Sequence, residues 1–114
     1  MSVPKLPEAP TKLTSQLLRE EPDLRDIVEE FVTGLPLLLA QIQQAVQRLD
    51  WQALATLAHR LKGAGGSYGY PEISRLCADA EEHVRAHDVA YLEAWLPRLA
   101  QVAAAAQAGL ANPE

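Results

Sequence analysis

One histidine stands in a setting that suits chemistry. His59 lies in a segment whose leucines, Leu54, Leu57 and Leu61, recur at helical spacing. Because each helical residue turns by about 100°, the leucine stripe lies roughly opposite His59, and the imidazole should point away from the core. A neutral imidazole keeps a nitrogen lone pair at physiological pH. An exposed histidine of this kind can therefore act as a nucleophile.

The residues predicted to share the face of His59 are small or basic. They are Ala55, Lys62, Gly63 and Gly66. A glycine inside a helix costs about 1 kcal/mol relative to alanine, and it suits a place where another body must approach the backbone closely. Lys62 follows the histidine by three residues and could balance negative charge arriving there, such as that of a phosphoryl group. The face predicts a nucleophile that is offered to a docking partner.

Each of these features alone has an ordinary explanation. A lone surface histidine is usually only solvated, and Lys62 by itself is an ordinary surface charge. Glycines in this run can also serve close helix packing, which we expect of Gly65 on the core side. Only the joint arrangement of histidine, lysine and glycines favours chemistry.

The run from Ala58 to Gly69, AHRLKGAGGSYG, resembles the signature of histidine-containing phosphotransfer (HPt) domains. That signature has an alanine–histidine pair, a lysine and a glycine three and four residues later, then small residues and a glycine. The resemblance implies that His59 is the phosphoryl acceptor, that Lys62 is a helper cation and that Gly63 clears the docking surface. The helical order of residues 12–110 also fits the family.

The same resemblance points to the helix that follows. In HPt domains this helix often carries a polar side chain that orients the second ring nitrogen of the histidine or the phosphoryl group. By position this residue is Glu81, and Arg85 is a possible second cation. A charged helix edge is also common without any such role.

The resemblance implies a phosphocarrier without autonomous kinase or phosphatase activity. Its expected partners are receiver domains of response regulators and a histidine kinase or hybrid histidine kinase. We expect no cofactor on this chain, and Mg²⁺ on the receiver. The alternative is a helical adaptor that binds a receiver or kinase without transferring phosphate. The intact histidine, lysine and glycine argue against an adaptor, which has no need of a nucleophile.

The helices that position these residues follow from apolar spacing and capping residues. The pattern predicts a short helix around Leu13–Leu18, a long helix kinked at Pro36, and three more that begin at Trp51, Pro71 and Val89. Asp50 and Asp88 are the predicted N-caps, and the helix of His59 should end near Tyr68–Gly69. Apolar positions of the long helix, in phase across Pro36, are Leu24, Ile27, Val28, Phe31, Leu35, Leu38, Leu39, Ile42, Val46 and Leu49.

Short connections force neighbouring helices to run antiparallel. We therefore predict an all-α fold, an antiparallel up-and-down four-helix bundle with an additional short N-terminal helix. The domain should span residues 11–111, after a flexible proline-rich arm at residues 1–10.

Composition excludes several classes of protein. With 114 residues the chain suits one domain, and its net charge of −5 argues against nucleic-acid binding. Its one cysteine, Cys77, excludes an internal disulfide. No apolar stretch approaches the roughly 20 residues that span a bilayer, and the first ten residues lack the apolar run of a signal peptide. We expect a cytoplasmic monomer that does not bind membranes.

A metal site is the competing chemical interpretation. His83 and His87 lie four residues apart, which is the spacing of a metal-binding pair on a helix. However, the helix is predicted to end between them, no third ligand lies nearby in sequence, and Cys77 lies on the core stripe. We predict no metal site.

Overall fold

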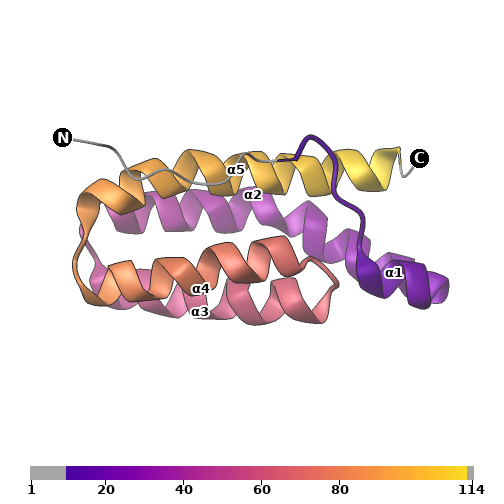
Figure 1. Cartoon of the computed structure of the whole chain (residues 1–114), viewed down its shortest axis with the longest axis horizontal. Helices are drawn as coiled ribbons and strands as arrows, with labels where there is room; N and C mark the ends of the chain where they lie inside the picture. Colours follow the sequence, from indigo (N-terminus) through magenta and orange to yellow (C-terminus); the bar gives the residue numbers. More distant parts are fainter. Residues whose placement is uncertain (1–9, 113–114) are drawn as a thin grey trace.

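The computed structural model describes residues 10–112. Within this range the chain is helical and forms no strand (Figure 1). The elements are α1 (Gln16–Glu20), the 3-10 turn η1 (Pro22–Leu24), α2 (Arg25–Gln47), α3 (Trp51–Ser67), α4 (Pro71–Arg85) and α5 (Val89–Ala111). Apart from residue 10, the predicted arm lies outside the described residues.

The long helices form an elongated bundle of 44 × 27 × 19 Å. In Figure 1, α2 and α5 lie together above the pair α3 and α4, and short turns connect successive helices. α1 lies at the end of the bundle where α3 turns into α4. This arrangement confirms the predicted all-α four-helix bundle with a short N-terminal helix. In the described part of the chain, no helix is long and apolar enough to cross a membrane.

The predicted caps fix where α3 and α5 begin. The Asp50 carboxylate accepts a hydrogen bond from the backbone N–H of Ala53, at 3.1 Å. The Asp88 carboxylate accepts one from the N–H of Tyr91, also at 3.1 Å. These side chains satisfy backbone donors that have no partner in the first turn of a helix.

α2 continues through Pro36 as one helix. This was predicted because the apolar positions keep the same helical spacing on both sides of the proline. Most of the predicted stripe is buried or half-buried, but Ile27 and Leu49 are exposed. Ile27 directly precedes Val28, which takes the core position, and adjacent helical residues point about 100° apart. Leu49 lies beyond the end of α2 with a φ of 53°, which turns its side chain out of the stripe.

α3 and α4 approach each other closely at Gly65. A Cβ atom at this position would lie 3.0 Å from both Ile73 Cγ2 and the Ser74 backbone nitrogen. Glycine therefore serves helix packing here, as expected from the sequence. The close approach brings side chains on one edge of α4 within reach of those on α3.

The segment before α1 is not helical where the sequence predicted it. Leu13 is buried, and its backbone N–H donates to the carbonyl of Ala105 in α5, at 2.9 Å. Two residues later the hydroxyl of Ser15 donates to the carbonyl of Tyr68, at 2.6 Å. The N-terminal segment thus joins α5 to the α3–α4 turn, and α1 begins only after these contacts.

Two glycines should respond oppositely to alanine. Gly69 has a φ of +88° and would place a Cβ 2.6 Å from Ser15 Oγ, so Gly69→Ala should lower the free energy of unfolding by about 1–3 kcal/mol. Gly34 lies inside α2, and a Cβ atom there would point into open space. Gly34→Ala should therefore raise the free energy of unfolding by up to about 1 kcal/mol. Urea denaturation measures both changes. Equal effects would contradict the assigned backbone conformations.

Candidate functional site

His59 lies on the outward face of α3, and its side chain is 72% exposed. Three buried side chains of the same helix anchor α3 to the bundle, those of Leu54, Ala58 and Leu61. The imidazole therefore belongs to a rigid helix while remaining open to a second molecule.

A carboxylate from α4 connects His59 to Lys62. Oε2 of Glu81 lies 3.2 Å from Nδ1 of His59, and Oε1 lies 2.6 Å from Nζ of Lys62. The Glu81 side chain is only 19% exposed, and that of Lys62 is 34% exposed. His59 and Lys62 of α3 thus meet on the one carboxylate of Glu81.

The electrostatics of this cluster favour an ionised Glu81. The hydrogen bond from Lys62 is the largest cause that lowers the pKa of the Glu81 carboxyl. Partial burial raises the pKa, and the hydrogen bond with His59 lowers it again. Because an ionised carboxylate only accepts hydrogen bonds, it favours a proton on Nδ1 of a neutral imidazole and leaves Nε2 with its lone pair.

Arg85, the possible second cation, is not part of the hydrogen-bonded cluster of His59, Lys62 and Glu81. It lies one turn after Glu81 on α4 and is exposed. Within residues 10–112 its side chain makes no hydrogen bond or ion pair. The structure therefore brings Glu81, but not Arg85, into contact with the histidine and lysine.

The residues expected to clear a docking surface are all exposed. They are Ala55, Gly63 and Gly66. A Cβ atom on Gly63 would have nothing within 4 Å, and one on Gly66 would lie 3.7 Å from Ser74 Oγ. The surface around the imidazole therefore has little side-chain bulk.

The ion pair between Lys62 and Glu81 was not predicted from the sequence. The sequence predicted Lys62 as a cation for an incoming charge, and the structure adds that its ammonium pairs with the carboxylate of Glu81 on α4. This ion pair could have been predicted from the register of two antiparallel helices that are joined by a turn of three residues. That register places Glu81 level with the turn of α3 that contains His59 and Lys62.

The two other histidines lie elsewhere in the bundle, and each stacks on an aromatic ring. Nδ1 of His83 lies 3.0 Å from Oδ2 of Asp88, and the His83 ring stacks on Tyr91. His87 stacks on Trp51 with ring centroids 4.3 Å apart. Among residues 10–112, no group of three or more histidine, cysteine or acidic side chains could hold a metal ion.

Comparison with known proteins gives one family. The family model described as the Hpt domain matches residues 26–109, which begin in the first turn of α2 and end near the end of α5. No curated protein and no solved structure gave a match.

The range matched by the Hpt domain model covers most of the chain and includes His59, Lys62 and Glu81. The family implies histidine phosphotransfer in two-component signal transduction, and its members are phosphocarriers that interact with receiver domains and histidine kinases. The chain belongs to the Hpt domain family.

Proposed function

We propose that His59 accepts a phosphoryl group from a histidine kinase or from the aspartyl phosphate of a receiver domain, and passes it to a receiver aspartate. One observation carries this proposal. An exposed imidazole has its Nδ1 held by a carboxylate that is itself paired with a lysine. This leaves Nε2 as the free nucleophilic atom of the ring.

The transfer step follows from this geometry. The lone pair of Nε2 attacks the phosphorus atom of the donor's aspartyl phosphate. The N–P bond forms as the P–O bond to the aspartate breaks, and the electron pair leaves on the aspartate carboxylate. The ring retains its Nδ1 proton and becomes cationic, and the ionised Glu81 at 3.2 Å stabilises that charge. In the return step a receiver aspartate attacks phosphorus, and the electron pair of the N–P bond returns to Nε2.

Lys62 supports the step in two ways. Its ammonium holds Oε1 of Glu81 at 2.6 Å and so keeps the carboxylate ionised and in place. An ammonium has three donors, and that of Lys62 is partly exposed beside His59. It can therefore also donate to an oxygen of the phosphoryl group, which adds close to two negative charges by analogy with other phosphorylated side chains.

The partner supplies the rest of the chemistry. A receiver domain brings the aspartate and an acidic pocket with Mg²⁺, while this chain supplies the nucleophile, the cation and the docking surface. We therefore infer a carrier that neither phosphorylates itself from ATP nor hydrolyses its own phosphohistidine.

Transfer from a ³²P-phosphorylated receiver domain tests the acceptor. The wild-type chain should gain an acid-labile, base-stable label, because phosphoramidates hydrolyse in acid. His59→Gln should gain none and should keep its helical circular dichroism, because the side chain lies outside the core. The matched control His87→Gln, also at an exposed position, should be labelled like the wild type.

Two outcomes would contradict the proposal. Labelled His59→Gln would place the acceptor elsewhere. An unlabelled wild-type chain that is folded and binds the receiver would favour the adaptor interpretation.

The role of Glu81 can be tested separately from that of the nucleophile. Glu81→Ala should release Nδ1 and allow the imidazole to exchange tautomers, and it should slow transfer by about tenfold to a hundredfold, because the nucleophile loses its orientation. ¹⁵N NMR of the histidine ring reports the tautomer, and rapid-quench labelling reports the rate. Glu82→Ala, which alters an exposed neighbouring carboxylate, is the control. An unchanged tautomer and rate in Glu81→Ala would remove Glu81 from the mechanism.

A further inference from the structure

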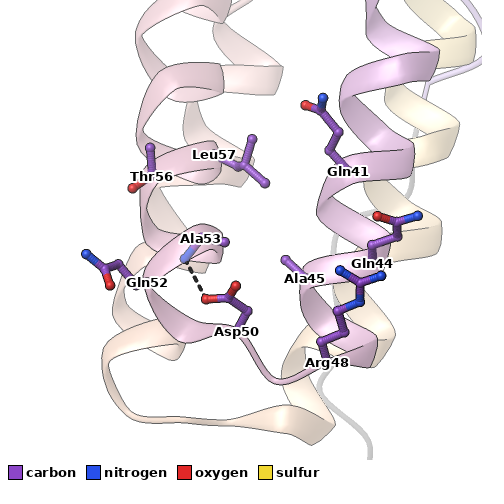
Figure 2. A pocket seen from close by; sticks show the side chains of 9 residues that line it. All are labelled: Gln41, Gln44, Ala45, Arg48, Asp50, Gln52, Ala53, Thr56 and Leu57. Carbon is purple, nitrogen blue, oxygen red and sulfur yellow. Dashed lines mark hydrogen bonds between the residues drawn. The ribbon is translucent and has the colours of Figure 1, made fainter.

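Two hollows in the surface of the bundle differ in how their polar groups are satisfied. The hollow between α2 and α3 is rimmed by three amide side chains, those of Gln41, Gln44 and Gln52 (Figure 2). All three residues are exposed, so solvent can reach their hydrogen-bonding groups. The other hollow lies beside α1, at the opposite end of the bundle (Figure 1). Its lining, unlike that of the first, includes a buried polar group that the described residues leave unsatisfied.

This second hollow, which we call the α1 hollow, brings together segments that are far apart in the chain. It is lined by Leu18 and Arg19 of α1, Arg25 of α2, Tyr70 before α4 and Leu110 of α5. Its volume is about 310 Å³, which lies at the lower end of the range of small-molecule sites. The α1 hollow is therefore large enough for a small organic ligand.

Hydrogen bonds between distant segments fix the walls of the α1 hollow. The hydroxyl of Ser15 donates to the carbonyl of Tyr68 at 2.6 Å and accepts from the backbone N–H of Leu18 at 3.1 Å. On the other side, the guanidinium of Arg25 donates to the carbonyl of Leu110 at 3.0 Å. The hollow is therefore a built feature of the folded bundle.

The hydroxyl of Tyr70 is the buried group that lacks a partner. Tyr70 is 0% exposed, and within residues 10–112 its hydroxyl oxygen makes no hydrogen bond. Ser15, which also lines the hollow and is also buried, has a partner for both roles of its hydroxyl. Folded proteins rarely leave such a group unsatisfied, because it has given up its hydrogen bonds to water. A ligand in the α1 hollow would supply the missing partner.

The Tyr70 hydroxyl offers a proton to such a ligand. Burial raises the pKa of this hydroxyl, and the charge of Arg25 opposes that shift only in part. The group therefore keeps its proton at neutral pH and acts as a donor. A negatively charged acceptor suits it best, because hydrogen bonds to an ionised acceptor are shorter and stronger than neutral ones.

The charge around the α1 hollow also favours an anion. Two arginines line it, and none of its described lining residues is acidic. Arg25 contacts Leu110 and, through Nε, the carboxylate of Glu29 at 3.5 Å. A guanidinium has five N–H donors, so these contacts leave others for a ligand. Arg19 is exposed, and within residues 10–112 its side chain makes no hydrogen bond or ion pair.

The rest of the lining narrows the class of anion. Leu18 and Leu110 contribute apolar side chains, and Tyr70 contributes its ring. These groups suit an apolar body, whereas they offer no hydrogen bonds to the remaining oxygens of a free phosphate. A carboxylate matches the planar fork of a guanidinium and carries a single charge.

We propose that the α1 hollow binds a small organic carboxylate with a short apolar body. The carboxylate accepts hydrogen bonds from Tyr70 and Arg25, and the charge of Arg19 attracts it from the rim. The apolar body lies against Leu18 and Leu110. The site does not involve His59, so binding here is independent of the proposed phosphotransfer.

Titration of the whole chain with hexanoate tests the proposal. Isothermal titration calorimetry should show saturable binding with a dissociation constant of about 1 mM or below, as expected for a ligand of this size. In ¹H–¹⁵N NMR spectra, the shifted amide signals should include those of Leu18, Tyr70 and Leu110. Hexan-1-ol lacks the charge and inorganic phosphate lacks the apolar body, so each should bind at least about tenfold more weakly.

Two variants separate the hydroxyl from the charge. Tyr70→Phe should weaken hexanoate binding by about tenfold or more, because it removes a hydrogen bond to a charged group. It should not lower the melting temperature of the free chain, since the hydroxyl has no partner there to lose. Arg19→Glu should also weaken binding by about tenfold or more, because it reverses a charge at the rim. Circular dichroism reports the folding of each variant.

Each variant has a matched control outside the α1 hollow. Tyr68→Phe removes a hydroxyl from a tyrosine that does not line the hollow, and Arg48→Glu reverses a charge at the hollow of Figure 2. Both controls should bind hexanoate within about twofold of the wild type.

Three results would overturn the proposal. The first is a folded wild-type chain that shows no saturable binding of hexanoate up to about 10 mM. The second is hexan-1-ol or phosphate binding as tightly as hexanoate. The third is wild-type affinity for hexanoate in either Tyr70→Phe or Arg19→Glu. None of these results would alter the role of His59, which phosphoryl labelling measures separately.

Discussion

The carboxylate of Glu81, shared between His59 and Lys62, is the contact on which the functional face depends. A histidine exposed on a helix normally rotates freely and exchanges tautomers. Here a residue 22 positions later in the chain holds one ring nitrogen and leaves the other open. Gly65 lets the backbones of α3 and α4 approach closely, which brings Glu81 within reach of α3. A glycine on the packed side of α3 thus supports the arrangement on its outer side.

The site has to be accessible and ordered at once. A fully exposed ion pair would add little order, since such pairs contribute only about 0–1 kcal/mol. Glu81 is mostly buried between its partners, so the pair can hold a geometry while the imidazole stays open. The bundle stabilises this arrangement from below, where Leu54, Ala58 and Leu61 are almost completely buried. The bare backbone at Gly63 weakens the helix locally and keeps the face open.

The helices, their caps and the bundle could be predicted from the sequence, but several contacts between distant segments could not. Asp50 and Asp88 cap their own helices, so spacing along the chain was enough to find them. Leu13 has helical apolar spacing, yet its backbone bonds to α5, a contact that no local pattern encodes. In the site, a family resemblance indicated Glu81, but the direction in which Lys62 points depends on the distance between helices. The role of Arg85 remains a prediction.

The most direct test of the role of His59 is to identify the atom that carries the phosphoryl group. The wild-type chain, labelled with ¹⁵N in its histidine rings and phosphorylated by a receiver domain, would be examined for ¹⁵N–³¹P coupling by NMR. We expect one phosphorylated ring, His59, bonded to phosphorus through Nε2 while Nδ1 keeps its proton beside Glu81. A phosphoryl group on Nδ1 of His59, or on another residue, would contradict it.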